Sequence, residues 1–254
     1  MLQDITPIIL SYNEADNIGR TLSALAWAKE ILVVDSFSTD NTLSICQSYD
    51  NVRVVRRAFD SASNQCNFAL QQNIQSEWVL SMDADYVVSK ALIEEMSSLQ
   101  PGSEVSGFEI SFNYLINGHM LKQSLYPPRL CLYRWQRAHY IQDGHTQRAI
   151  VDGLIVRLKE KIKHDDRKPY SRWLASQRRY ALMEAEKLKR KNWRTIAWPD
   201  RVRLIGLGPL AVVPYTLLSK GLIKEGWPGL VYVWQRFIAE CYLLSARLGI
   251  LQKN

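Results

Sequence analysis

Short apolar runs alternate with helical stretches through the first hundred residues, and this alternation is the strongest constraint on the fold. The runs cover residues 5–10, 31–35, 52–56 and 78–82. Runs of this length that are apolar on both faces are typical of parallel strands buried in a sheet. Helix start signals stand between them, at Asn13 or Asp16, at residues 38–40, and at Ser61 or Ser63. Repeated β-α units at this spacing predict a doubly wound α/β sheet, which binds ligands beyond the carboxyl ends of its strands.

Polar residues follow three of the four runs, at the edge where such a sheet binds its ligand. They are Ser11, Tyr12, Asn13 and Glu14 after the first run, Asp35, Ser36 and Ser38 at the end of the second, and Asp83 and Asp85, on either side of Ala84, after the fourth. The glycine-rich patterns G-x-G-x-x-G and G-x-x-x-x-G-K-[ST] do not occur in the sequence. Their absence argues against a dinucleotide-dependent dehydrogenase and against a P-loop NTPase.

Asp83 and Asp85 form a D-x-D pair at the predicted end of the fourth strand. Side chains two residues apart on a strand point to the same face, so the two carboxylates are expected to lie together. Mg²⁺ or Mn²⁺ prefers such oxygen ligands and leaves positions open for phosphate oxygens. A bound cation of this kind stabilises the negative charge of a diphosphate leaving group.

The second half of the chain divides into a sheet-like part and a helical part. Within residues 101–165 the segments VSGFEISF and RLCLYR predict further strands and loops for an acceptor. Residues 170–192 predict a basic helix, with one apolar face formed by Trp173, Leu174, Tyr180, Met183 and Leu188. We therefore expect a nucleotide-sugar-binding half over 1–100, an acceptor and catalytic half of the same domain over 101–169, and a helical tail over 170–254.

The tail differs in composition from the rest of the chain. Residues 204–219 carry no charge but contain two glycines and two prolines, whereas a spanning helix needs about 20 apolar residues without such breaks. The following segment is rich in Trp and Tyr and is interrupted by Arg236, Glu240 and Arg247. Amphipathic segments of this kind favour a place in the lipid headgroup region. A helical hairpin packed on the core, or a homodimer interface, is the alternative.

Charge is distributed unevenly within the formal net charge of +7. Residues 1–100 have 6 Lys and Arg against 13 Asp and Glu, whereas residues 157–203 have 16 against 6. Such a basic block indicates an anionic partner, either a membrane surface or a nucleic acid that stacks on Trp173, Trp193 and Trp198, unless it is simply a solvated face. Four scattered cysteines and an N-terminus without a basic leader predict reduced thiols, no secretory signal peptide and a cytoplasmic setting.

Several motifs, taken in order, resemble the family 2 inverting glycosyltransferases with a GT-A fold. SYNEADNIGRTLSAL, ILVVDSFSTDNT and EWVLSMDADY carry the resemblance in the first half. The later segments YPPRLCLYR, VDG, KIKH and KGLIKEGWPGLVYVWQRF are most similar to the branch of lipopolysaccharide-core β-glucosyltransferases. The resemblance spans nearly the whole chain. It implies a Rossmann-like mixed sheet flanked by helices, with an amphipathic helical tail, and a peripheral place on the inner face of the cell membrane.

The resemblance also implies roles for individual residues. Ser11, Tyr12, Asn13 and Glu14 are expected to line the base and ribose pocket, Asp35 to bind the base with Ser36 and Ser38 nearby, and Asn67 to contact the nucleotide. Asp83, with Ala84 beside it, is expected near the ribose, Arg129 near the diphosphate or donor sugar, and Asp85 and His164 on Mg²⁺ or Mn²⁺. Asn13 and Asp35 are alternatively helix caps, Arg129 a surface charge, and His164 the partner of a surface ion pair with Asp165 or Asp166.

An inverting transfer needs one group that accepts the proton of the attacking hydroxyl. Asp143, in YIQDGHTQRA, is the candidate base, and His145 is a reserve candidate or an orienting group. The sequence departs from the related branch in this segment, because Thr146 and Gln147 stand where that branch carries a His-Glu pair. Phe37 likewise stands where the family often has glycine.

The chain lacks the Q-x-x-R-W signature of processive polysaccharide synthases, so transfer of a single sugar is favoured. The expected donor is a nucleotide sugar, such as a UDP-hexose, and the expected acceptor is a glycan or a lipid-linked glycan of the cell envelope. A polyprenyl-phosphate sugar transferase is the alternative enzyme. A nucleic-acid-binding module that uses residues 157–203 is the alternative from another class, and the acidic first hundred residues argue against it.

Overall fold

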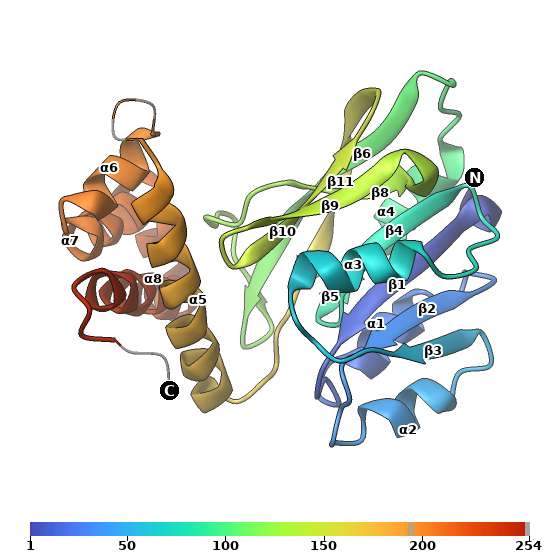
Figure 1. The fold of residues 1–254 in the computed structure, drawn as a ribbon, viewed down its shortest axis with the longest axis horizontal. Coiled ribbons are helices and arrows are strands. Elements are labelled where there is room, and N and C mark those ends of the chain that lie inside the picture. The colour runs from blue at the N-terminus through green and yellow to red at the C-terminus, as the bar shows by residue number, and fades with distance from the viewer. Residues whose placement is uncertain (193, 195, 252–254) are drawn as a thin grey trace. The chain divides into compact units, whose positions relative to one another are not determined.

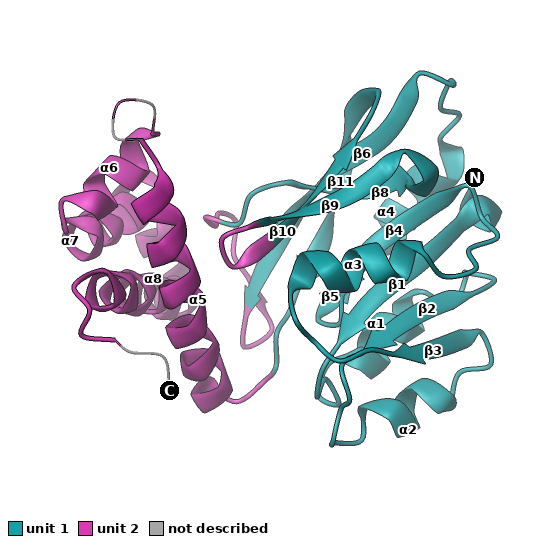
Figure 2. Cartoon of the chain, in the orientation of Figure 1, with its two compact units in different colours: residues 1–115, 126–142, 147–167 teal, residues 116–125, 143–146, 168–254 magenta. Residues whose placement is uncertain are grey.

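The computed structural model describes residues 1–192, 194 and 196–251. Trp193, one of the tryptophans of the basic block, lies outside the described residues. The chain forms two compact units (Figure 2). Unit 1 comprises residues 1–115, 126–142 and 147–167, and unit 2 comprises residues 116–125, 143–146 and 168–254. Each unit is described separately below.

Four parallel strands form one half of the main sheet of unit 1, in the spatial order β3-β2-β1-β4 (Figure 1). They are β1 (Ile5–Ser11), β2 (Ile31–Asp35), β3 (Val52–Arg56) and β4 (Trp78–Asp83). Each strand agrees with a predicted run to within one residue, so this part of the prediction is confirmed. Every residue of β2 is buried, which explains why its run is almost wholly apolar.

The other half of the sheet mixes strand directions. β8 (Arg129–Arg134) runs antiparallel to β4 and to β6 (Val105–Ile116), and β6 pairs in parallel with β11 (Leu154–His164). The short β5 (Tyr86–Val87) pairs antiparallel with β11, and β7 (His119–Met120) pairs with β6. A separate two-stranded sheet contains β9 (Ala138–Asp143) and β10 (Thr146–Val151). The predicted mixed α/β sheet, with further strands in residues 101–165, is thus confirmed.

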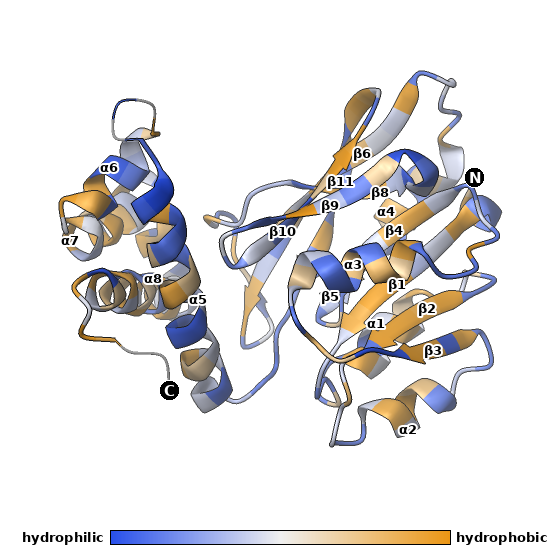
Figure 3. Ribbon diagram, viewed as in Figure 1, coloured by the Kyte–Doolittle hydropathy of each residue, from blue (hydrophilic) through white to orange (hydrophobic). Residues whose placement is uncertain are grey.

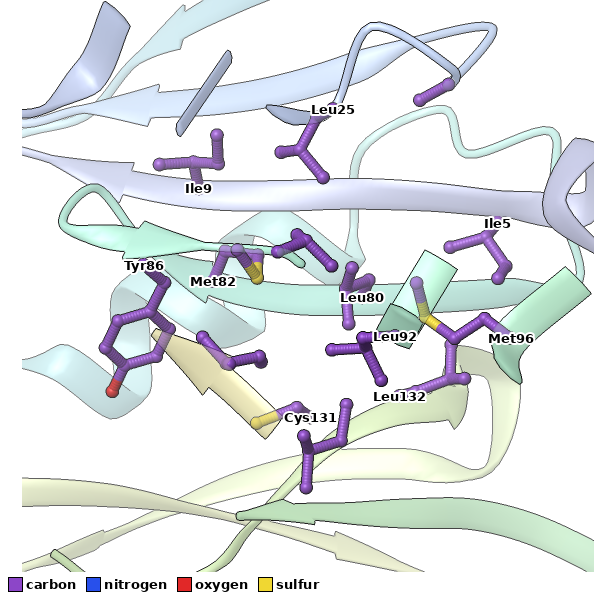
Figure 4. Packing of buried hydrophobic residues seen from close by; sticks show 14 of the residues in the cluster. Ile5, Ile9, Leu25, Leu80, Met82, Tyr86, Leu92, Met96, Cys131 and Leu132 are labelled. Carbon is purple, nitrogen blue, oxygen red and sulfur yellow. The ribbon is translucent and has the colours of Figure 1, made fainter. Parts of the chain in front are cut away.

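Side chains from both faces of the sheet contribute to the core, because alternate residues of a strand point in opposite directions. One hydrophobic cluster includes Ile5, Ile9, Val33, Leu80 and Met82 (Figure 4). The second cluster includes Ile8, Leu32, Val34 and Val79. A shift of one residue in register would exchange these two sets, so burial on both faces determines where each strand ends relative to its neighbours.

Four helices follow the strands of unit 1. They are α1 (Ile18–Ala24), α2 (Thr42–Gln47), α3 (Ala62–Leu70) and α4 (Lys90–Ser98). The predicted cap of α3 is confirmed, because the Ser61 hydroxyl accepts a hydrogen bond from the backbone N–H of Asn64. The starts predicted for α1 and α2 were too early. Asn17 and Asn41 are their caps, and neither Asn13 nor Asp35 caps a helix, because the preceding residues form polar loops that bond to each other.

Helices make up most of unit 2. They are α5 (Tyr170–Arg190), α6 (Trp198–Leu204), α7 (Gly208–Pro214) and α8 (Gly226–Arg247). The predicted basic helix over 170–192 is confirmed as α5, which packs against α8. The four cysteines of the chain, Cys46, Cys66, Cys131 and Cys241, are all free thiols, as predicted.

The apolar face predicted for α5 is confirmed only in part, because Trp173, Leu174, Tyr180 and Met183 are half-buried. Ala181, Ala185 and Leu188 are the buried residues of this helix, and they pack with Leu243 and Ala246 of α8. Of the five side chains predicted to form the face, Leu188 is the only one that is buried. Small alanine side chains let the two helices approach closely, so the packed face follows their positions rather than those of the largest apolar residues.

The tail does not continue as one regular helix after residue 204. Helix α7 ends at Pro214, and a π-helical turn (Tyr215–Ser219) and a 3-10 turn (Leu222–Glu225) separate it from α8. The interruption predicted from the prolines is therefore confirmed at Pro214. No helix within the described residues is both long enough and apolar enough to cross a membrane. Apolar residues are nevertheless frequent in α7 and α8 (Figure 3).

Candidate active site

The carboxyl ends of β1, β2 and β4 lie side by side, because β1 pairs in parallel with both other strands. In this register Ser11 lies beside Asp35, and Leu10 lies beside Asp83. The polar clusters that follow three separate runs of the sequence therefore meet at one edge of the sheet. This edge is where an α/β sheet binds its ligands.

Asp35 is fully buried at the end of β2, and three hydrogen bonds compensate the burial of its carboxylate. Its Oδ2 accepts from the hydroxyls of Ser11, at 3.0 Å, and Ser38, at 2.5 Å. Its Oδ1 accepts from the backbone N–H of Ser38 at 2.8 Å. Hydrogen bonds to an ionised acceptor are the strong kind, so this network holds the carboxylate in one orientation.

Hydrogen bonds join the loop after β1 to the loop after β2. The amide oxygen of Asn13, a residue with a positive φ of 53°, accepts from the backbone N–H of Thr39 at 2.7 Å. The backbone N–H of Glu14 donates to the Thr42 hydroxyl at 2.7 Å. Tyr12 directly precedes these anchored residues, and its side chain is exposed. The two loops thus form one structure that presents an aromatic ring to solvent.

The D-x-D pair does not have the strand geometry that the sequence predicts. Asp83 is the last residue of β4, whereas Ala84 and Asp85 form the turn into β5. The expectation that both carboxylates share one strand face is therefore wrong, because the alternation of side chains ends with the strand. Asp83 lies 3.5 Å from Nη1 of Arg129, and Asp85 lies 3.2 Å from Nε2 of His164.

Arg129 is not a surface charge, since its side chain is mostly covered. Its Nη1 donates to the phenol oxygens of Tyr86, at 3.1 Å, and Tyr126, at 3.4 Å. Its Nη2 donates to the backbone carbonyl of Gln147 at 3.3 Å. The guanidinium is therefore held beside Asp83 at the sheet edge, where a planar group with several donors suits an oxyanion.

The side chain of His164, in the same unit, is largely covered at 13% exposed, so His164 is not a surface residue paired only with its neighbours. The rings of Tyr86, Tyr114 and Tyr126 surround its imidazole edge-on, with centroids 4.7–5.2 Å away. Burial alone lowers the pKa of His164, but the nearby carboxylates, above all that of Asp85, hold the pKa above its ordinary value. Its Nδ1 is buried without a hydrogen-bond partner among the described residues.

The Asp85–His164 pair fits a divalent cation by its chemistry. Carboxylate oxygen and imidazole nitrogen are both ligands of Mn²⁺, and the Nδ1 of His164 leaves an unsatisfied polar atom in a buried place. No group of three or more His, Cys, Asp or Glu residues able to hold a metal occurs in the part of the chain that the structure describes. A cation here would therefore take its remaining ligands from a substrate and from water, as Mg²⁺ and Mn²⁺ commonly do.

Two other predicted donor contacts are occupied by groups of the chain itself. The hydroxyl of Ser36 accepts from Nε2 of Gln65 at 2.7 Å. The side-chain amide of Asn67 donates to the carbonyl of Tyr140 at 2.9 Å and accepts from its N–H at 2.8 Å. The Asn67 amide therefore satisfies both backbone groups of Tyr140, as a paired strand would. These two hydrogen bonds hold α3 to β9.

The candidate base, Asp143, is the last residue of β9, and residues 143–146, which connect β9 to β10, belong to unit 2. Within that unit, Oδ1 of Asp143 forms an ion pair with Nζ of Lys187 at 2.7 Å. His145 is held by Glu184, whose Oε1 lies 2.7 Å from the ring Nδ1 and accepts from the backbone N–H at 3.0 Å. The His145 ring also packs on Tyr180, with the two centroids 4.7 Å apart.

Glu184 and Lys187 were not predicted as functional residues. They stand three residues apart on α5, a spacing that indicates only a local ion pair. Burial alone raises the pKa of Glu184, but the hydrogen bonds and charge of His145 and the charge of Lys187 lower the pKa to about 2. No local signal reveals these contacts, because they join α5 to a turn about 40 residues earlier in the chain.

Comparisons with known proteins identify relatives of the first part of the chain. Residues 6–102 match the family described as Glycosyl transferase family 2. The lipopolysaccharide core biosynthesis glycosyltransferase LpsC of Rhizobium meliloti is 32% identical over 112 residues, which cover 42% of this chain and 41% of LpsC. A glycosyltransferase of Rickettsia bellii is 34% identical over 97 residues, covering 38% of this chain and 32% of the relative. The chain thus matches less than half the length of these curated relatives.

Solved structures resemble nearly the whole chain. TarS 1-349 of S. aureus covers 98% of this chain and 91% of its own, with a TM-score of 0.51 and 17% identity. A mannosyltransferase of Pyrobaculum calidifontis, solved in complex with GDP-Man and Mn²⁺, covers 96% of this chain and 86% of its own, with a TM-score of 0.54 and 15% identity. Identities this low speak for the fold alone, which is that of the GT-A glycosyltransferases, as predicted.

Proposed function

We propose, from the premise that residues 6–102 carry a glycosyl transferase family 2 domain, that this chain transfers a single sugar from a nucleotide sugar to a glycan or lipid-linked acceptor. The transfer inverts the anomeric centre and is assisted by Mg²⁺ or Mn²⁺. The observation that carries the proposal is the register of β1. It brings the buried Asp35 network and the Asp83–Asp85 turn to the same edge of the sheet. Such an edge can bind the two ends of a nucleotide diphosphate.

The donor assignments follow the order of groups along that edge. We assign the base and ribose to the loops after β1 and β2, where Tyr12 is exposed and Asp35 is held by serines. The diphosphate and donor sugar are assigned to the side of Asp83 and Arg129. The assigned donor residues are Ser11, Tyr12, Asn13, Glu14, Asp35, Ser36, Ser38, Asn67, Asp83, Ala84 and Arg129. Support for a nucleotide sugar comes from TarS 1-349, a structural neighbour that was also solved in complex with UDP-GlcNAc.

The metal-binding role is assigned to Asp85 and His164. A divalent cation held there supplies positive charge that stabilises the diphosphate as the bond to the sugar breaks. Asp85 provides a charged oxygen and His164 a nitrogen, and both side chains are largely buried, so they are preorganised. Arg129 adds a fixed positive charge beside Asp83. The mannosyltransferase neighbour that was solved with Mn²⁺ supports this assignment by analogy of fold.

The proton-accepting role is assigned to Asp143. An inverting transfer is one direct displacement, in which a single base accepts the proton of the acceptor hydroxyl. Lys187 holds the Asp143 carboxylate in a defined position through an ion pair. His145, held by Glu184, is the reserve candidate for the same step or an orienting group for the acceptor.

We further propose that the acceptor is a growing cell-envelope glycan, such as the core of a lipopolysaccharide. LpsC, the curated relative named for this pathway, supports the assignment over the matched 112 residues. A polyprenyl phosphate as the acceptor is the alternative. The two acceptor classes are separated by the product, because a sugar on a polyprenyl phosphate is released by mild acid whereas a glycosidic bond to a glycan is not.

The proposed function is tested by incubating the chain with UDP- and GDP-sugars in the presence and absence of Mn²⁺. We expect one nucleotide sugar to raise the melting temperature and to be hydrolysed slowly, and both effects to disappear in EDTA. A single-stranded oligonucleotide is the control ligand for the alternative that residues 157–203 bind nucleic acid. A rise in melting temperature with the oligonucleotide, and with none of the nucleotide sugars, would contradict the proposal.

Unit 2 carries a surface that suits a membrane. Large apolar side chains are exposed in the connection between α6 and α7, along α7, in the turns after it and in the first half of α8. They are Ile205, Leu207, Leu210, Tyr215, Leu218, Ile223, Trp227, Leu230 and Trp234. Leu210 and Trp227 are 71% and 72% exposed, and α7 packs against α8. Exposed apolar surface on this scale indicates an interaction site.

The net charge of unit 2 indicates what kind of partner this surface binds. Unit 2 contains 17 Lys and Arg against 6 Asp and Glu, a net charge of +11. Most of its carboxylates are already in ion pairs, such as Glu240 with Arg203 and Asp200 with Lys191. The excess positive charge is therefore available to an anionic surface, and each basic residue near such a surface contributes about 1 kcal/mol. Tryptophans are typical of the lipid headgroup region.

We therefore propose that unit 2 binds anionic lipid at the inner face of the cell membrane, where a lipid-linked acceptor is anchored. The test is flotation with vesicles of neutral or of anionic lipid. Wild-type chain should float with anionic vesicles at low salt and less at high salt, because salt screens the electrostatic part. Leu210→Ser with Trp227→Ser should reduce binding by at least about 10-fold, since each side chain buries apolar surface worth about 1.5–3 kcal/mol.

The matched control is Leu154→Ser with Ile155→Ser, which changes two exposed apolar residues of unit 1. It should float like the wild type. Equal flotation of both double variants would contradict the assigned surface. If the wild type does not float but sediments as a dimer that Leu210→Ser with Trp227→Ser dissociates, the surface is a homodimer interface instead.

A further inference from the structure

Helix α1 places a buried hydroxyl against the turn between the two D-x-D carboxylates. The Thr21 side chain is fully buried, and its Oγ1 donates to the backbone carbonyl of Ala84 at 2.7 Å. A helical threonine or serine usually bonds to a carbonyl of its own helix. Ser23 of α1 does so, because its hydroxyl donates to the carbonyl of Gly19 at 2.8 Å. Thr21 instead reaches a different element, 63 residues away in the chain.

The preceding residue of α1 reaches the segment that follows His164. Nη1 of Arg20 lies 2.7 Å from the carboxylate of Asp165, and Nη2 donates to the Asp165 carbonyl at 2.8 Å. Asp165 is 4% exposed, and a carboxylate so deeply buried needs a charged partner. The same Nη2 donates to the side-chain oxygen of Asn17 at 2.7 Å. Arg20 thus binds the backbone and the side chain of the residue next to His164.

A third contact joins the turn that carries Asp85 directly to the segment that follows His164. The backbone N–H of Asp165 donates to the backbone carbonyl of Asp85 at 3.1 Å. Asn17, the cap of α1, accepts from the backbone N–H of Arg167 at 3.0 Å and donates to the Glu14 carboxylate at 3.0 Å. The helix therefore bonds to the turn that carries Asp85, to the segment that carries His164, and to the loop assigned to the donor.

We propose that Thr21 and Arg20 are positioning residues that set the distance between Asp85 and His164. This inference rests on the proposed metal role of that pair. Neither residue ligates the cation, but each holds a backbone segment next to one ligand, Thr21 at Ala84 and Arg20 at Asp165. Groups that orient metal ligands from outside the coordination sphere typically contribute 10- to 100-fold to metal affinity. We call the contacts of Thr21 with Ala84 and of Arg20 with Asp165 the brace. Through Asn17 and Glu14, α1 also bonds to the donor loop.

The test compares Thr21→Val with Thr21→Ser and Ser23→Ala. Valine keeps the size of threonine and removes the hydroxyl, and serine keeps the hydroxyl. Ser23→Ala removes a hydroxyl of the same helix that bonds to Gly19 and Tyr49, and not to the segments beside Asp85 and His164. Mn²⁺ binding is measured directly from the electron paramagnetic resonance signal of the free ion, together with the melting temperature without ligand. Thr21→Val should weaken Mn²⁺ binding by about 10-fold or more, whereas Thr21→Ser and Ser23→Ala should bind like the wild type.

Arg20→Lys provides a second arm that does not depend on the hydroxyl. Lysine keeps the positive charge beside Asp165 but cannot bond to three acceptors in fixed directions, so Mn²⁺ binding should again weaken. If Thr21→Val and Arg20→Lys fold and bind Mn²⁺ as tightly as the wild type does, while Asp85→Asn binds it weakly, the brace is overturned and the metal role of Asp85 is not. Absence of Mn²⁺ binding by the wild-type chain, both alone and with UDP present to supply the remaining ligands, overturns the metal assignment and the brace with it. A defect shared equally by Ser23→Ala shows a general effect on α1 and also overturns the brace.

Discussion

Nε2 of His164 lies 3.2 Å from Oδ2 of Asp85, although 79 positions separate the two residues in the chain. The contact depends on strand pairing. His164 is the last residue of β11 and pairs with Tyr86 of β5, which directly follows Asp85. Any change that shifts β5 along β11 therefore separates the imidazole from the carboxylate.

Asp85→Asn keeps the shape of the side chain and removes its charge. We expect Mn²⁺ affinity to fall more than about 100-fold, because loss of a ligand costs more than loss of a group that orients one. Transfer should be abolished while the melting temperature without ligand changes little. Metal titration and turnover before and after EDTA check this, with Asp50→Asn, an exposed acid of unit 1, as the control. Near-normal turnover of Asp85→Asn in EDTA would exclude the metal role.

Asp143→Asn tests the assignment of the base. Turnover should fall by roughly 10²–10⁴-fold, the usual contribution of a positioned acid or base, while the dissociation constant of the donor stays nearly unchanged. Lys187→Met should give a smaller loss, since it removes only the group that holds Asp143. Single-turnover rates and donor binding are the measurements. If donor affinity collapses in parallel, Asp143 belongs to the donor pocket, and a larger loss in His145→Gln moves the role to His145.

The lowered pKa of Glu184, about 2, predicts how the stability of unit 2 depends on pH. A carboxyl whose pKa is lower in the folded state stabilises the fold above its unfolded pKa, and this contribution is lost as the pH falls towards the folded value. Glu184→Gln should therefore reduce the free energy of unfolding at pH 7 by on the order of 2 kcal/mol. The difference from the wild type should shrink between about pH 4.5 and pH 2.

Urea unfolding of both proteins at pH 7, 5, 4 and 3 measures this difference. Glu186→Gln is the matched control, because Glu186 stands on the same helix and forms an exposed pair with Lys189 at 3.1 Å. Exposed pairs contribute little, so its effect should stay below about 1 kcal/mol at every pH. A Glu184→Gln deficit that is the same at pH 3 as at pH 7 would show that packing, not charge, is responsible.

Phe37 has a φ of 63°, in the left-handed region, and the guanidinium of Arg56 lies 4.5 Å above its ring. This conformation costs a residue with a β-carbon about 1–2 kcal/mol, and glycine adopts it freely. Phe37→Ala keeps that cost and loses the ring, whereas Phe37→Gly loses the ring but relieves the cost. Phe37→Gly should therefore be more stable than Phe37→Ala by about 1 kcal/mol, measured by urea unfolding. Equal stability would mean that the turn changes conformation in the variants.

Local patterns were sufficient for the strands and for the place of the site. The run from Ile31 to Asp35 is apolar on both faces, so its burial within a sheet can be predicted without knowing its neighbours. Ser61 was recognised as a cap because a cap bonds to a backbone N–H three residues away. The meeting of Ser11 with Asp35 follows from parallel strands alone, since their carboxyl ends share an edge.

Contacts between distant segments were beyond such patterns. The packed face of α5 contains Ala181 and Ala185, because small side chains let α8 approach closely. The hydropathy of the α5 sequence does not show where α8 packs. The Asn67 amide bonds to β9, which only the tertiary structure brings beside α3, and the expected contact of Asn67 with a nucleotide stays a prediction. Glu184 and Lys187 carry no local signal of their contacts with the turn at 143–146.

The sequence by itself determined that two carboxylates, those of Asp83 and Asp85, stand at the end of a buried strand. Only the tertiary structure decided which partner each carboxylate has. Asp83 meets Arg129, whereas Asp85 meets His164. The physical reason is that β4 ends at Asp83, so the chain turns and the rule of alternating side chains stops applying between the two residues. Strand pairing across the sheet then places Arg129 beside Asp83 and His164 beside Asp85, and that pairing is a property of the whole fold.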